Sequence, residues 1–90
     1  MHIVADRDKL LARVRRIAGQ VAAVERQLTG DDGCSETLQL VASVRGAVGS
    51  LMEELIEQHM REHVACPGLS DEARAAAAEE MLALIRRYGK

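Results

Sequence analysis

Histidine and cysteine are the residue types in this 90-residue sequence that are best suited to metal chemistry. His59 and His63 are four residues apart, so on a helix their imidazoles lie one turn apart on the same face and can bind one metal ion. The pair alone is a weak signal, because histidines at this spacing also arise by chance on solvated helices. Cys34 offers a sulfur ligand, and it strengthens the prediction of a metal site only if its thiol can reach the same ion.

Cys34 precedes His59 by 25 residues, which on a continuous helix corresponds to roughly 37 Å. One chain therefore cannot bring the thiol and the two imidazoles to one ion. If two copies of the helix pair in antiparallel orientation about a twofold axis, Cys34 of one chain comes beside His59 and His63 of the other. The spacing then predicts two equivalent metal sites, each spanning the dimer interface.

The other candidate ligands also have simpler interpretations. Cys34 taken alone is a small, half-buried hydrophobic residue at a helix start, and His2 taken alone is a tail residue with no defined role. Cys66 follows His63 by three residues but stands beside Pro67, so it is either an auxiliary ligand or a bystander. Two cysteines in a cytoplasmic chain are better explained as thiols or metal ligands than as a structural disulfide.

Apolar residues recur at spacings of three and four along the chain, which predicts helices and no strands. The predicted helices span, in order, Asp8 to a stop at Thr29 and Gly30, Cys34 to about Val64, and Ala75 to Tyr88. The apolar positions of the first helix are Leu10, Leu11, Val14, Ile17, Val21, Val24 and Leu28. Ser70 is the expected N-cap of the third helix. We therefore predict an all-α, three-helix protomer with a long central helix.

The chain is expected to be a single small domain over residues 1–90. A core of this size barely outweighs chain entropy and no disulfide framework helps, so burial should continue in partner chains. Charges interrupt every apolar run, so none can cross a bilayer, and residues 1–8 lack the basic and apolar regions of a signal peptide. We expect a cytoplasmic, oligomeric protein without membrane contact.

Positive charge is concentrated in the N-terminal third of the chain, although the net charge of the whole chain is -2. Residues 1–30 carry six cations and three acids, whereas residues 31–66 carry two cations and seven acids. Since DNA affinity depends on local cation placement, and an oligomer multiplies any basic patch, this gradient is compatible with DNA binding. The sequence contains no recognisable acid/base pair, nucleophile triad or phosphate-binding loop, so an enzyme is the least expected class. Two alternative functions remain compatible with the sequence: a metal-storage helical bundle and a helical adaptor protein that binds no ligand.

Several of these residues together resemble the CsoR/RcnR family of small repressors, over about residues 6 to 64. The matching positions are Arg13-Val-Arg-Arg-Ile-Ala-Gly-Gln20, Cys34, Val44-Arg-Gly-Ala47, Gly49, Leu51-Met52, Glu54, His59 and His63. The resemblance implies a homotetramer built as a dimer of antiparallel dimers, which binds operator DNA and releases it when an effector binds. It also implies, together with the charge gradient, a DNA-facing surface formed by Lys9, Arg13, Arg16 and Arg45.

Family members sense different effectors according to four positions, which here hold His2, Cys34, His59 and His63. This set is similar to that of the nickel- and cobalt-sensing branch, with the α-amine of Met1 as an auxiliary ligand. One thiolate with imidazoles and an amine suits Ni(II), Co(II) and Zn(II) better than Cu(I), which prefers sulfur. If Cys66 joins, Zn(II) and Cu(I) become harder to exclude. A formaldehyde-responsive repressor is the other alternative, although that branch uses an N-terminal proline where this chain has His2.

Overall fold

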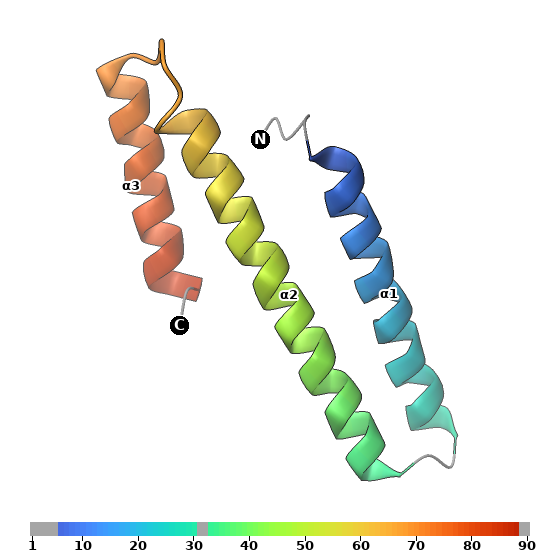
Figure 1. The fold of residues 1–90 in the computed structure, drawn as a ribbon. Coiled ribbons are helices and arrows are strands. Elements are labelled where there is room, and N and C mark those ends of the chain that lie inside the picture. Colours follow the sequence, from blue (N-terminus) through green and yellow to red (C-terminus); the bar gives the residue numbers. More distant parts are fainter. Residues whose placement is uncertain (1–5, 31–32, 89–90) are drawn as a thin grey trace. The chain divides into compact units, whose positions relative to one another are not determined.

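The computed structural model describes residues 6–30 and 33–88, and within them the chain is entirely helical apart from its connections. The three helices are α1 (Arg7–Thr29), α2 (Cys34–His63) and α3 (Asp71–Tyr88) (Figure 1). The predicted all-α class with a long central helix is confirmed, since α2 has 30 residues and the described part of the chain contains no strand. Met1 and His2 lie outside the described residues.

α3 begins four residues earlier than predicted, at Asp71 instead of Ala75. The Ser70 hydroxyl accepts a hydrogen bond from the Ala73 backbone N–H at 3.0 Å, which confirms Ser70 as the N-cap. Asp71 and Glu72 then occupy the first turn, where their negative charge is favourable at the positive end of the helix dipole. The cap therefore fixes the start of the helix more closely than the later apolar positions do.

A connection over residues 64–70 joins α2 to α3. The backbone N–H groups of Val64 and Ala65 both donate to the Met60 carbonyl, at 3.0 and 2.9 Å, and this closes the last turn of α2. Gly68 then adopts a φ of 86°, which is a conformation that residues with a side chain rarely adopt. Glycine at this position lets the chain turn at low conformational cost.

One compact unit contains α1 and the part of α2 that reaches Met52. The two helical segments run antiparallel, and the Gln20 side-chain amide donates to the Ser43 hydroxyl at 3.5 Å between them. Leu10 is the one buried residue among the described residues of this unit, with 7% of its surface accessible. Ile17 and Val24 follow Leu10 at intervals of seven and are half-buried, so they form the inner stripe of α1.

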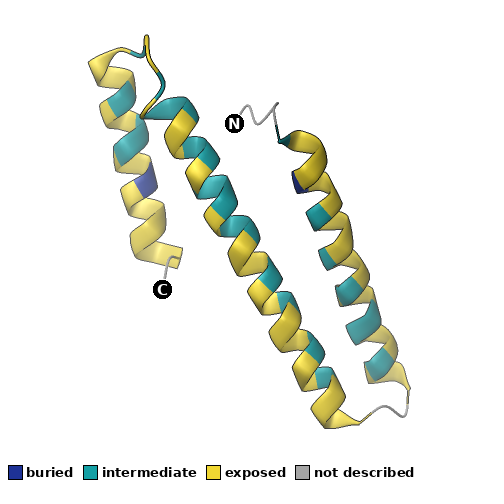
Figure 2. Cartoon of the chain, viewed as in Figure 1, coloured by how far each residue is buried: buried dark blue, intermediate teal, exposed yellow. Residues whose placement is uncertain are grey.

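The other apolar residues predicted for the first helix form a second stripe, which is exposed (Figure 2). Leu11, Val14, Val21 and Leu28 belong to it, and Leu28 keeps 72% of its surface accessible. On α2, Leu38, Val41 and Val48 are likewise exposed. In a single chain the apolar residues of α1 therefore do not form one buried face. Four of the seven apolar positions predicted for this helix are exposed in the single chain.

The second compact unit contains the rest of α2, from Glu53, together with α3. Met81 of α3 is buried, whereas the apolar residues that follow it in α3 are exposed, including Ile85 and Tyr88. The Arg74 guanidinium donates to the Cys66 carbonyl at 3.3 Å and so ties α3 to the turn that precedes it. Neither unit contains more than one buried apolar side chain among the described residues, so the chain buries little apolar surface by itself.

None of the helices in the described part of the chain combines the length and the apolar character that crossing a membrane requires.

Candidate metal site and DNA-facing surface

The last two turns of α2 place His59 and His63 together. Their ring centroids are 4.7 Å apart and the ring planes are inclined by 41°. Both side chains are half-buried, and Nδ1 of His59 is buried without a hydrogen-bond partner. A buried imidazole nitrogen without a partner is costly, and histidines that bind a metal usually have both ring nitrogens occupied. The predicted pairing of these two histidines is therefore present, with unused bonding capacity at one nitrogen.

Glu62 joins this pair, which was not predicted from the sequence. One of its carboxylate oxygens lies 3.7 Å from Nε2 of His63 and is buried with no hydrogen-bond partner. Its position next to His63 in sequence, three residues after His59, was the signal that could have revealed it. A carboxylate at this place can orient the His63 ring.

Cys34 is the first residue of α2, and its side chain is exposed as a free thiol. It lines an open pocket at the end of the α1–α2 hairpin. The other lining residues are Gln27, Leu28, Gly30, Thr37 and Leu38. The Thr37 hydroxyl donates to the Gly33 carbonyl at 3.4 Å, so it is already engaged. The thiol is thus accessible from outside the chain, as a ligand of a metal shared with another molecule must be.

Cys66 lies in the turn after α2 and is half-buried. Its thiol donates to the Pro67 carbonyl at a sulfur–oxygen distance of 3.5 Å. Within the described residues of one chain, no three side chains among histidine, cysteine, aspartate and glutamate lie close enough together to hold a metal ion. Cys66 therefore does not complete a three-ligand group with His59 and His63 in a single protomer.

The four residues predicted to face DNA lie in the unit formed by α1 and the first part of α2. Lys9, Arg16 and Arg45 are exposed, whereas Arg13 is half-buried and already takes part in an interaction. The contact between Gln20 and Ser43 sets the register of the two antiparallel segments. In that register Arg45 lies opposite residue 18. Arg16 is two residues from that position, which is about 3 Å along the axis of α1. Arg16 and Arg45 are thus close together along the length of the hairpin, whereas Lys9 lies about 14 Å from the level of Arg45.

Comparison with known proteins finds a matching family model, sequence relatives and a solved structure. A family model described as a metal-sensitive transcriptional repressor matches residues 6–87. An uncharacterized protein in the bioA 5' region of Serratia marcescens is 45% identical over 89 residues, which cover 99% of this chain and 98% of that protein. The transcriptional repressor RcnR of Salmonella arizonae is 44% identical over 73 residues, which cover 81% of this chain and 79% of that protein.

A solved structure with the same fold is that of a glutamate-to-histidine variant of the formaldehyde-responsive regulator FrmR from Salmonella enterica serovar Typhimurium. It is 40% identical in sequence, with a TM-score of 0.90, and the match covers 98% of this chain and 99% of that structure.

Proposed function

Because this chain belongs to the CsoR/RcnR family of metal-sensitive transcriptional repressors, we propose that it represses transcription until Ni(II) or Co(II) binds at a site shared by two protomers. Cys34 of one chain and His59 and His63 of another form the site, with His2 and the α-amine of Met1 completing it. Metal-free protein binds operator DNA, and the metal-loaded protein releases it.

The observation that carries this proposal is the histidine pair at the end of α2. The ring centroids of His59 and His63 are 4.7 Å apart, which allows one nitrogen from each ring to bind the same metal ion at about 2.0–2.1 Å. Together with a thiolate, two imidazoles make a donor set that borderline ions prefer. A carboxylate oxygen of Glu62 lies 3.7 Å from Nε2 of His63 and can hold that ring in place as a ligand.

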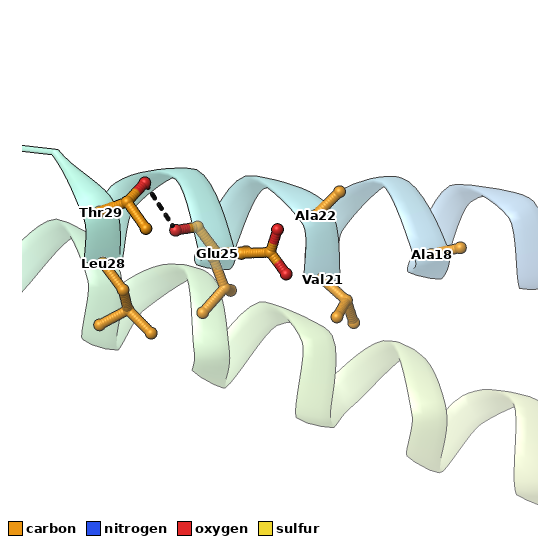
Figure 3. A pocket seen from close by; sticks show the side chains of 7 residues that line it. Ala18, Val21, Ala22, Glu25, Leu28 and Thr29 are labelled. Carbon is orange, nitrogen blue, oxygen red and sulfur yellow. Dashed lines mark hydrogen bonds between the residues drawn. The ribbon is translucent and has the colours of Figure 1, made fainter.

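Assembly of several chains is supported by the exposed apolar stripe of α1. Its members Leu11, Val14, Val21 and Leu28, together with Ala18 and the charged Glu25, follow one another at spacings of three and four. This is the repeat by which one helix packs against another. Figure 3 shows part of the stripe along an open hollow, with the side chains of Val21 and Leu28 on the same side of the helix. An antiparallel dimer would cover such a stripe and bring Cys34 of one chain toward the histidines of its partner.

DNA release requires that metal binding and DNA binding oppose each other. In the proposed assembly the metal ligands from the N-terminal segment and from Cys34 flank both ends of α1, which carries Lys9, Arg13 and Arg16. Filling the site would then hold α1 and its cations in an arrangement that fits DNA less well. A coupling of about 1–3 kcal/mol per site is typical of allosteric proteins, and several sites per assembly would add to it.

Formaldehyde is the second candidate effector, because the FrmR variant has the same fold at 40% identity. In this reading the exposed thiol of Cys34 would react with the aldehyde instead of binding a metal. Zn(II) and Cu(I) also stay open, since Cys66 is a free thiol three residues after His63.

Operator binding with each effector decides between these candidates. The reduced protein is titrated with promoter DNA from its own gene in the presence of Ni(II), Co(II), Zn(II), Cu(I) or formaldehyde. The proposal expects Ni(II) or Co(II) to release DNA from the wild type but not from Cys34→Ser or His63→Ala. Release by formaldehyde with a mass increase at Cys34, and none by any metal, would replace the metal-sensor proposal with the aldehyde one.

A further inference from the structure

The pocket beside Cys34 contains a side chain that the metal-site proposal does not use. Gln27, in the last two turns of α1, lines this pocket together with the Cys34 thiol. Its carboxamide oxygen is buried without a hydrogen-bond partner. The amide NH2 group of Gln27 is not among the buried unpartnered atoms of the described residues, so it is the end of the carboxamide that stays accessible.

The other groups that line the pocket cannot serve as side-chain hydrogen-bond donors to the thiol. Leu28 and Leu38 are apolar, the Thr37 hydroxyl already donates to the Gly33 carbonyl, and Gly30 has no side chain. The Gly30 backbone N–H already donates to the Gln27 carbonyl at 3.4 Å. Gln27 is therefore the one uncommitted side-chain donor in the lining of the pocket that holds the proposed sulfur ligand.

We propose that Gln27 is a positioning residue of the metal site, whose amide N–H donates a hydrogen bond to the Cys34 thiolate when that thiolate binds the metal. This inference rests on the proposed function, since it requires Cys34 to be a ligand. Groups that hold ligands in place in this way typically contribute about 10- to 100-fold to metal affinity.

Gln20 provides a matched control, because it is the same residue type one heptad earlier on the same helix. Its carboxamide oxygen is also buried without a partner, but its amide donates to Ser43 and it does not line the pocket beside Cys34. Gln20→Met and Gln27→Met both retain an unbranched side chain of good helix propensity, and both remove a carboxamide whose oxygen is buried. Only the second change removes a donor from beside the thiol.

The experiment measures Co(II) affinity and the sulfur-to-cobalt charge-transfer band of the full-length, reduced protein. In Gln27→Met the affinity should fall about 10-fold, and the band should move to longer wavelength because the thiolate loses a stabilising hydrogen bond. Gln20→Met should leave both unchanged relative to the wild type. Circular dichroism of the metal-free variants shows whether each of them is folded.

The outcomes separate this inference from the proposed function. If the wild type binds Co(II) without a charge-transfer band that depends on Cys34, the thiol is not a ligand and both proposals fail. If the wild type has this band and Gln27→Met matches the wild type in band position and affinity, the role of Gln27 fails while the metal site stands. Equal changes in Gln20→Met and Gln27→Met would also overturn it, because they would reflect only the loss of buried amides.

Discussion

The imidazole rings of His59 and His63 lie 4.7 Å apart between centroids on successive turns of α2, with Glu62 in contact with His63. Two imidazoles on successive turns of one helix face are placed so that both can bind the same metal ion.

Replacing His63 with alanine should weaken Co(II) binding strongly and leave metal-free DNA binding intact. The loss should exceed the roughly 10- to 100-fold that is typical when only a group supporting a ligand is removed. Competition titration with a chelator of known affinity measures it. His2→Ala tests the N-terminal ligand in the same assay. Unchanged Co(II) affinity in His63→Ala would remove this histidine from the site.

Reversing the charge at Arg16 should lower operator affinity and its dependence on salt. Arg16 is exposed on α1, and each lost phosphate contact reduces the slope of log affinity against log salt by about 1. Arg26→Glu makes the same change in net charge at another exposed position of α1 and serves as the control. Fluorescence anisotropy over a series of salt concentrations gives both slopes. If the two variants behave alike, Arg16 belongs to a merely solvated basic face.

Introducing a charge at Val21 should disrupt the assembly of chains. In a single chain Val21 is 51% exposed, and substitution at an exposed position usually changes stability by no more than about 0.5 kcal/mol. If another chain covers the stripe, Val21→Asp buries an unpaired charge, and the oligomer should dissociate. Ala12→Asp adds the same charge at another exposed position of α1 outside the stripe. Sedimentation velocity that finds the same mass for both variants would place the interface elsewhere.

The turn between α2 and α3 should be sensitive to the residue at position 68. Gly68→Ala requires a side chain at a φ of 86°, which should cost about 1–2 kcal/mol although nothing obstructs the new methyl group. Gly19→Ala, in the middle of α1 and also unobstructed, should instead gain about 0.5–1 kcal/mol. Urea unfolding of the two variants at equal protein concentration compares them. A loss in Gly19→Ala as large as that in Gly68→Ala would contradict this explanation.

The local parts of the fold were predictable because they depend on short-range patterns. The apolar spacing predicted the three helices. Ser70 was predicted as the N-cap of α3, which the hydrogen bond from the Ala73 backbone N–H to the Ser70 hydroxyl confirms. The spacing of His59 and His63 alone was enough to predict their pairing, because a helix fixes which residues share a face. The resemblance to the CsoR/RcnR family is confirmed by the family match over residues 6–87.

Burial and the surroundings of the site were not predictable from the sequence in the same way. Periodicity does not tell Leu10, which is buried, from Leu11, which is exposed, because both lie on apolar stripes and only packing decides between them. The contact of Glu62 with His63 depends on side-chain conformation, and the pocket that joins Gln27 to Cys34 depends on how α1 meets α2. The ligand set of His2, Cys34, His59 and His63 stays a prediction.

The measurement that tests the central claim most directly is Co(II) and Ni(II) affinity with and without operator DNA. If metal binding releases the repressor, DNA must weaken metal binding by the same factor, which for a coupling of about 1–3 kcal/mol is roughly 5- to 150-fold per site. The account predicts weaker metal binding by the DNA complex, and no such difference in Cys34→Ser. Equal metal affinity of the free protein and of its operator complex would contradict the account, however tightly the metal binds.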